Sequence, residues 1–219
     1  MTPNRKSRGP ASADSGPGSR AKILDTAEAL FSRRGFNGVS LREVADRAGL
    51  GKSSLFHHFA NKLSLYVAVL ERILTQIDAR VEAAQEHTAS ALARLHQWVD
   101  AIVDTLAENP THAPLLLRAL FEGEVVDAKD SSRLNHILQR TLGRVAHDLQ
   151  EGMESGEFRS VSVPHTLQTL IGMSIYHFAS GEFGNDLLQN PVFSAAEVRR
   201  RKEHIFSFLE HGLVQEVSQ

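Results

Sequence analysis

A group of polar and basic side chains between residues 40 and 62 carries the chemistry that this sequence offers most clearly. The group comprises Ser40, Arg42, Lys52, Ser53, Ser54, His57 and Lys62. Such side chains can donate hydrogen bonds to base edges and phosphate oxygens, and the guanidinium fork of Arg42 suits guanine. Lys62 is expected at the N-terminus of a helix, where backbone N–H groups already favour a phosphate. These residue types indicate recognition of a nucleic acid.

Two short helices are expected to position these side chains. The first begins at Ser40, whose hydroxyl can cap the helix while Glu43 reaches back to it. The second spans about residues 52–59, and Gly49 lies in the three-residue turn between the two. This arrangement is typical of a helix-turn-helix, which lays its second helix in the major groove. Periodicity alone leaves open an ordinary pair of helices with a solvated polar face.

A resemblance favours the first interpretation. Residues 45–65, A-D-R-A-G-L-G-K-S-S-L-F-H-H-F-A-N-K-L-S-L, resemble the DNA-binding signature of the TetR family, which is similar to A-x-x-A-G-V-S-x-G-T-L-Y-x-Y-F-x-x-K-E-x-L. The resemblance extends back to Ala27 and covers roughly residues 20–66. Position by position, it implies that all seven polar residues named above face DNA.

Four positions depart from that signature. Gly51 stands where the usual residue is a capping serine, and Phe56 and His58 replace two customary tyrosines. Leu63 stands where an acidic residue is usual. Because a glycine still tolerates the geometry of a helix cap, these departures bear on the phosphate contacts rather than on the fold.

The distribution of charge agrees with a binding surface at one end of the chain. The 219 residues carry a net charge of −2, but residues 1–62 hold 11 Lys and Arg against 5 Asp and Glu. Residues 63–219 hold 13 against 21, so a basic N-terminal part precedes an acidic body. The chain has no cysteine and no apolar run long enough for a membrane span, and its polar N-terminus is not expected to be a signal peptide. A cytoplasmic protein without a membrane partner is expected.

The hydrophobic periodicity predicts an all-α fold of about nine helices. Residues 1–19 are expected to form a disordered tail because they contain almost no large apolar side chains. Residues 20–66 are expected to form the three-helix DNA-binding domain, and the resemblance implies that residues 67–219 form a helical domain for effector binding and dimerisation. The predicted helices span residues 20–34, 40–48, 52–59, 62–81, 89–108, 114–121, 132–155, 164–179 and 195–214.

The resemblance implies that the C-terminal domain holds a pocket for a small molecule. The candidate contacts are large or amphipathic residues of its central helices: Trp98, Leu117, Arg118, Phe121, Ile137, Met173, Tyr176 and His177. For each of them, an ordinary place in the core is the favoured alternative. The expected effector is an unidentified, largely apolar small molecule.

The resemblance also implies a homodimer. The helices that begin near Pro164 and Ser194 each carry a broad apolar face, and two such pairs could form a four-helix bundle between subunits. The alternative is that both faces are buried within their own chain.

Three classes of function therefore compete. The first is a ligand-responsive repressor that binds a roughly palindromic, double-stranded operator and is released by its effector. The second is an architectural DNA-binding protein that is controlled by a protein partner and has a fully packed body. An enzyme is the third class, but the sequence lacks G-x-G-x-x-G, P-loop, H-E-x-x-H and G-x-S-x-G motifs and any cysteine nucleophile. No cofactor is expected, and the 11 histidines show no recognised metal-ligand spacing.

Overall fold

The computed structural model describes residues 17–84, 90–121 and 132–215, and these residues form ten helices. The helices are α1 (Pro17–Arg34), α2 (Leu41–Arg47), α3 (Lys52–His58), α4 (Lys62–Ala84), α5 (Ala91–Glu108), α6 (His112–Phe121), α7 (Ser132–Glu154), α8 (Val163–Ala179), α9 (Gly181–Leu188) and α10 (Ala195–Leu213). The all-α prediction is confirmed. The helix that the sequence did not reveal is α9, whose eight residues include two glycines and too few apolar positions for a periodic pattern.

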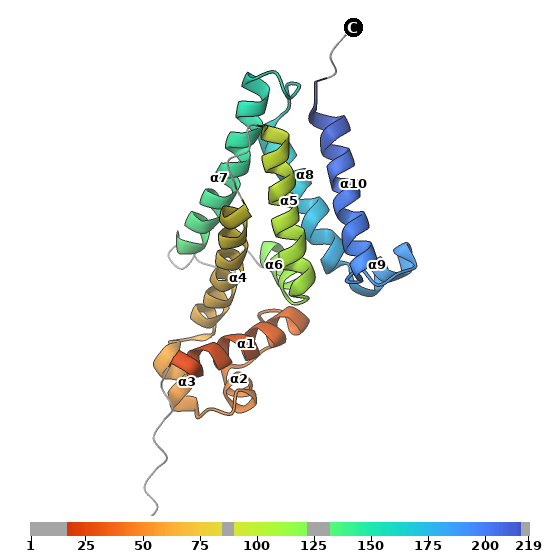
Figure 1. Ribbon diagram of the computed structural model, residues 1–219. Helices are drawn as coiled ribbons and strands as arrows, with labels where there is room; N and C mark the ends of the chain where they lie inside the picture. The colour runs from red at the N-terminus through yellow and green to blue at the C-terminus, as the bar shows by residue number, and fades with distance from the viewer. Residues whose placement is uncertain (1–16, 85–89, 122–131, 216–219) are drawn as a thin grey trace, which may run out of the picture.

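The helices separate into a small N-terminal unit and a larger body (Figure 1). Helices α1, α2 and α3 lie together at one end, and α4 extends from them into the body. There α4 packs against α5 and α7, while α10 runs along α5 and α1 contacts α6. The predicted boundary between residues 66 and 67 falls inside α4, so one continuous helix joins the two parts.

Side-chain caps set several helix starts where the sequence placed them. The amide of Glu43 donates to Ser40 Oγ at 3.2 Å, and the amide of Glu197 donates to Ser194 Oγ at 3.3 Å. The amide of Ser64 donates to Asn61 Oδ1 at 2.8 Å at the start of α4. Each bond satisfies a backbone donor that the first turn of a helix leaves unpaired.

The N-terminal end of the chain differs in part from the expectation. Helix α1 begins at Pro17, three residues before the predicted start, so the predicted tail is too long at its C-terminal side. The rest of that tail, residues 1–16, lies outside the described residues. Residues 122–130, an acidic stretch between two predicted helices that the sequence favours as a loop, lie outside them as well.

An aromatic cluster joins the small unit to the base of α4. The ring of the buried Tyr66 meets those of Phe31 and Phe36 at centroid distances of 5.0 and 5.2 Å, both edge to face. The quadrupole of aromatic rings favours edge-to-face contacts, and these contacts also remove apolar area from water. This cluster holds α1 and the loop after it against α4.

Candidate DNA-binding surface and internal cavity

The α2–α3 pair has the geometry of a helix-turn-helix. Gly49 lies between the two helices with φ +69°, a left-handed conformation that favours glycine because it has no Cβ. The amide of Leu50 donates to the carbonyl of Ala45 at 3.0 Å, which fixes the turn. Gly51 then caps α3 without a side-chain hydrogen bond, as its lack of a side chain requires. The sequence therefore folds locally into two helices with one short, defined turn.

Four of the predicted DNA contacts lie exposed on this unit. The side chain of Arg42 is 86% exposed and has Asp46 as a partner only at 3.9 Å. Lys52, Ser53 and His57 are exposed on α3. These side chains come from the first turn of α2 and one side of α3, so their donors are available to a ligand outside the protein.

Two other predicted contacts have a different role in the structure. Ser54 is only 4% exposed, which contradicts the prediction that it points outward from α3. Ser40 is exposed, but its hydroxyl already accepts the Glu43 amide as a helix cap. Because residues 53 and 54 are adjacent on a helix, they face about 100° apart, and the apolar core takes the face of Ser54.

Lys62 also differs from the expectation. Its ammonium donates to the carbonyls of Phe36 at 2.9 Å and Val39 at 3.2 Å, and it lies 4.2 Å from the centroid of the Phe36 ring. These contacts hold the loop that precedes α2 against the start of α4. The structure therefore gives Lys62 a positioning role in this state, and a phosphate would have to compete with the two carbonyls.

The departures from the family signature lie beside the exposed donors. Phe56 is exposed, and the ammonium of Lys52 lies 5.6 Å from the centroid of its ring. His58 is half-buried and its ring lies 5.3 Å from that of His57. The apolar edge of Phe56 at this surface offers a base methyl group or sugar a contact in place of a phenol's hydrogen bond.

A partly open cavity of about 280 Å³ lies between helices α4, α5, α6, α7 and α8, and one of its lining residues, Leu120, is largely exposed. Its walls consist mainly of aliphatic side chains: Leu70, Leu74, Ile77, Trp98, Ile102, Leu106, Leu116, Ala119, Leu120, Leu134, Leu138, Thr141, Leu142, Ile171 and Ile175. An apolar cavity of this size fits the lower end of small-molecule sites in proteins.

Of the eight predicted ligand contacts, Trp98 is the one that lines this cavity. The other seven, Leu117, Arg118, Phe121, Ile137, Met173, Tyr176 and His177, are not part of its wall. Phe121 is 83% exposed, and Arg118 donates to the carbonyl of Arg33 at 3.4 Å. The sequence could identify amphipathic helices here, but not the direction in which each residue points.

Helix phase explains why the candidates on α8 are not part of this wall. Ile171 and Ile175, four residues apart, share the face that lines the cavity. Tyr176 is exposed on another face, and the buried His177 has Nε2 3.3 Å from the Val192 carbonyl. The residues that line the cavity were missed because aliphatic positions of this kind are typical of any helical core.

A second feature, here called the junction cluster, connects the small unit to the body. Glu28 of α1 accepts hydrogen bonds from Arg72 of α4 at 2.5 Å and from Thr111, just before α6, at 2.6 Å. His112 Nε2, at the start of α6, lies 3.4 Å from the same carboxylate. Arg72 also pairs with the exposed Asp25 at 2.6 Å. Three helices therefore meet at one carboxylate.

The pKa of Glu28 reflects this environment. Burial by itself would raise the pKa, but the hydrogen bonds from His112, Thr111 and Arg72 outweigh it and lower the pKa from 4.5 to about 2. The carboxylate is therefore charged over the whole physiological range and stabilises the contact between α1, α4 and α6.

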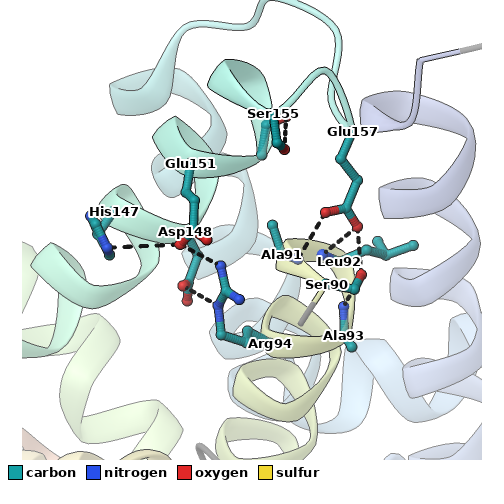
Figure 2. A network of polar contacts seen from close by, with 11 residues as sticks. Ser90, Ala91, Leu92, Ala93, Arg94, His147, Asp148, Glu151, Ser155 and Glu157 are labelled. Carbon is teal, nitrogen blue, oxygen red and sulfur yellow. Dashed lines mark hydrogen bonds and ion pairs between the residues drawn. The ribbon is translucent and has the colours of Figure 1, made fainter. Parts of the chain in front are cut away.

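A third feature, the distal cluster, lies at the other end of the body (Figure 2). Arg94 of α5 donates to Asp148 at 2.6 Å and to Glu151 at 2.7 Å, both on α7. Glu157 accepts from Ser90 Oγ at 2.5 Å and from the amides of Ala91 and Leu92 at 2.9 and 3.0 Å. Its carboxylate thus caps α5 from outside the helix. The distal cluster joins the start of α5 to the end of α7.

Several large apolar residues of the body are exposed. Tyr176 on α8, Phe183 and Leu187 on α9, and Phe208 on α10 are all exposed. The C-terminal half of α8 leads into α9, and α10 lies nearby on the same side of α5 (Figure 1). Exposed large apolar residues of this kind are typical of a surface that contacts another protein.

Metal and membrane sites were sought in the part of the chain that the structure describes. There, no group of three or more His, Asp or Glu residues is placed to hold a metal ion. No helix among the described residues is long and apolar enough to cross a bilayer.

Comparison with known proteins agrees with this architecture. Residues 23–69 match the family described as "Bacterial regulatory proteins, tetR family". Residues 92–209 match "Tetracyclin repressor-like, C-terminal domain". The first match spans α2 and α3, and the second spans most of the body.

Individual relatives are transcription factors of the helix-turn-helix type. The transcriptional activator FasR of Mycolicibacterium smegmatis is 29% identical over 147 residues, which cover 66% of this chain and 65% of that protein. The transcriptional repressor KstR2 of Rhodococcus jostii is 30% identical over 159 residues, 69% of this chain and 74% of that protein. The chain thus spans just under two thirds of FasR's length.

A solved structure extends the likeness to the whole fold. The ketosteroid transcriptional regulator KstR2 of Mycobacterium tuberculosis superposes with a TM-score of 0.73, covering 94% of this chain and all of that one at 20% identity. The helix-turn-helix, the helical body and the two matched regions lead to one conclusion: this chain belongs to the tetR family of bacterial regulatory proteins.

Proposed function

We propose that this protein is a ligand-responsive transcriptional repressor that binds a roughly palindromic operator as a homodimer. In this proposal α3 enters the major groove, and a small, largely apolar effector in the body releases the DNA. One observation carries the proposal: exposed donors on α2 and α3 and an apolar cavity occur in one molecule and are connected by α4 and α6.

The DNA contacts are assigned from the exposed side chains. Arg42 and Lys52 provide positive charge for base edges or phosphates, while Ser53 and His57 add further hydrogen-bond donors on α3. Ser54 and Lys62 support this surface from behind, Ser54 in the core and Lys62 at the loop before α2. The proposed readers are therefore Arg42, Lys52, Ser53 and His57.

Dimerisation follows from the geometry of an operator. A protein that reads two half-sites needs two recognition helices about 34 Å apart, roughly one turn of DNA. The exposed apolar residues Tyr176, Phe183, Leu187 and Phe208 provide a surface on which a second copy can bury them. Because this surface belongs to α8, α9 and α10, it leaves α3 free.

The coupling between effector and DNA is assigned to α6 and α4. Helix α6 contributes Leu116, Ala119 and Leu120 to the cavity, and His112 at its first turn belongs to the junction cluster. A ligand that separates α6 from α4 therefore disturbs the position of α1 through Glu28. It acts only through its different affinity for the DNA-bound and released states.

The alternative of an architectural protein with a fully packed body is less well supported, because a cavity of about 280 Å³ interrupts that body. The proposal includes repression rather than activation. Of the two relatives described above, KstR2 of Rhodococcus jostii aligns over the larger share of both chains, and it is a repressor.

A DNA-binding experiment tests the proposal. A fragment selected from a random duplex library is expected to bind the wild-type protein as a complex with two chains per site. The double variant Arg42→Ala with Lys52→Ala should bind about 100-fold more weakly, because each lost contact to DNA is worth roughly 1–3 kcal/mol.

The matched control removes the same charge elsewhere. Arg133→Ala with Arg199→Ala changes two exposed residues on α7 and α10 and should leave the affinity within about twofold, since only distant, screened charges are lost. Failure to select any binding sequence, or equal losses in the two double variants, would contradict the proposal.

A further inference from the structure

An exposed phenylalanine interrupts the polar surface of α3. Phe56 is 42% exposed, whereas the other exposed residues of this helix, Lys52, Ser53 and His57, are all polar. Phe56 stands where the family signature has a tyrosine, so this ring lacks the hydroxyl that would give it a polar end. A ring of this kind gains free energy when a partner removes it from water, provided that the partner's surface there is also apolar.

Phe56 lies within the exposed face of α3 rather than at its edge. Successive residues of an α-helix are rotated by about 100°, so Lys52 and His57 mark the two edges of an exposed arc about 140° wide. Phe56 is inside this arc, about 40° from Lys52, and the buried Ser54 and Leu55 lie outside it. When α3 enters a major groove, the ring therefore faces the base pairs, and the edges of the arc face the two phosphate backbones.

Lys52 and Phe56 are presented together. The ammonium of Lys52 lies 5.6 Å from the centroid of the Phe56 ring, a distance at which the ring quadrupole attracts a cation. Four residues of helix advance by about 6 Å, which is less than two base-pair steps of about 3.4 Å each. A charged donor and an apolar ring thus reach the same or neighbouring base pairs.

The major groove offers one apolar group to such a ring. Its base edges present hydrogen-bond donors and acceptors, and thymine adds the methyl group on C5. A phenyl ring placed over a donor or acceptor would remove it from water without supplying a hydrogen bond. Against the thymine methyl group, both surfaces are apolar and no hydrogen bond is lost.

We propose that Phe56 contacts the 5-methyl group of one thymine in each half-site of the operator, beside the group that Lys52 binds. Phe56 is then a specificity-determining residue that favours thymine over the other bases at this position. The inference rests on the proposed function, because it requires that α3 enters the major groove of a duplex.

Replacing thymine by 2′-deoxyuridine tests the contact directly, because the change removes the methyl group and keeps the hydrogen bonds of the base pair. In the duplex selected from the random library, each thymine position is replaced in turn, in both half-sites at once. Wild-type affinity is measured by fluorescence anisotropy. At one position the affinity should fall about 15-fold, because one buried methyl group contributes about fourfold per half-site. At every other position it should change less than about twofold, since no apolar side chain of α3 other than Phe56 is exposed there.

The variant Phe56→Ala should remove the preference. Its affinities for the thymine duplex and for the uracil duplex at the sensitive position should agree within about twofold, since the partner of the methyl group is gone. Phe121→Ala is the matched control: it removes a phenylalanine that is 83% exposed on α6, and it should keep the 15-fold difference seen with the wild-type protein. If Phe56→Ala does not fold, the series of uracil duplexes on the wild-type protein decides the matter.

Three results would overturn this inference and leave the proposed function intact. They are a selected operator without thymine in its half-sites, an operator in which no uracil replacement weakens binding, and a Phe56→Ala variant that keeps the wild-type preference for thymine. If Phe56→Ala weakens binding while the wild-type protein does not distinguish thymine from uracil, the ring contacts a sugar instead. Failure to select any binding sequence would overturn the proposed function together with the inference.

Discussion

The junction cluster and the distal cluster use the same chemistry at opposite ends of the body. In each, an arginine and neighbouring donors hold a carboxylate: Arg72 with Glu28 in one, Arg94 with Asp148 in the other. They differ in what they connect. The junction cluster joins α1 to α4 and α6, whereas the distal cluster joins the start of α5 to the end of α7. All four of these body helices line the cavity, but only the junction cluster connects them to α1.

This difference suggests how a helical body can be stable and still respond to a ligand. The distal cluster holds one end of the body together, so a ligand in the cavity acts mainly on the other end. There, Glu28 is the common acceptor through which α6 and α1 are connected. Both clusters are therefore expected to stabilise the fold, the junction cluster more than the distal cluster, but only the junction cluster is expected to transmit a change from the cavity to α1.

The largest effect is expected for Glu28→Gln. Because folding lowers the pKa of Glu28 to about 2, its charged form stabilises the fold at pH values above the unfolded value of 4.5. This stabilisation is lost as the pH falls from about 5 towards 2. The variant should lose about 3 kcal/mol of unfolding free energy at pH 7, and its stability should vary less over that acidic range. Urea unfolding at pH 7 and pH 3 measures both.

Hydrogen exchange sharpens this prediction. In Glu28→Gln, amides of α1 and α6 should lose protection together, because the cluster is their shared contact. Asp25→Asn is the matched control, as it removes the other partner of Arg72, a carboxylate that is 71% exposed. It should change stability by less than about 1 kcal/mol. Equal losses in the two variants would remove the special role assigned to Glu28.

A smaller effect is expected for Asp148→Asn in the distal cluster. The change removes the charge from a buried partner of Arg94, which keeps Glu151 as a second, more exposed partner. The unfolding free energy should fall by about 2 kcal/mol, the value of a hydrogen bond between charged groups. Exchange should increase at the start of α5 and the end of α7. Faster exchange in α1 as well would contradict the separation of the two clusters.

The smallest effect is expected for Glu157→Gln. Burial would raise the pKa of Glu157, but hydrogen bonds from Ser90 and the amides of Leu92 and Ala91 lower it. Its capping bonds are thus strongest above the unfolded pKa and weaken as the pH falls below that value. The variant should lose about 1 kcal/mol, typical of a helix cap, as measured by thermal unfolding at pH 7. A loss equal to that of Glu28→Gln would contradict the predicted order of these stability losses.

Local interactions explain how much of the fold could be predicted. The starts of α2, α4 and α10 depend on Ser40, Asn61 and Ser194, which bond to amides three residues away. Such contacts are encoded within one turn of helix and can be inferred from residue order. Helix α9 was missed because its short, glycine-containing sequence lacks a periodic apolar face, so it depends on packing against α8.

The candidate DNA-binding surface was predictable to the same extent. Arg42, Lys52, Ser53 and His57 are exposed, as a helical projection indicates. Ser54 and Lys62 differ because their surroundings come from other parts of the chain. The acceptors of Lys62, the carbonyls of Phe36 and Val39, lie more than 20 residues before it and could not be inferred from its neighbours.

By itself, the sequence determined nine of the ten described helices, the turn at Gly49 and the family, because caps, glycine positions and apolar spacing act over a few residues. Only the tertiary structure decided which aliphatic residues border a cavity, that Trp98 is the one predicted contact there, and that Glu28 joins three helices. Each of these depends on how helices distant in sequence are rotated against one another. Residues such as Leu74 and Ile171 have the same local pattern whether they face a void or a neighbouring side chain.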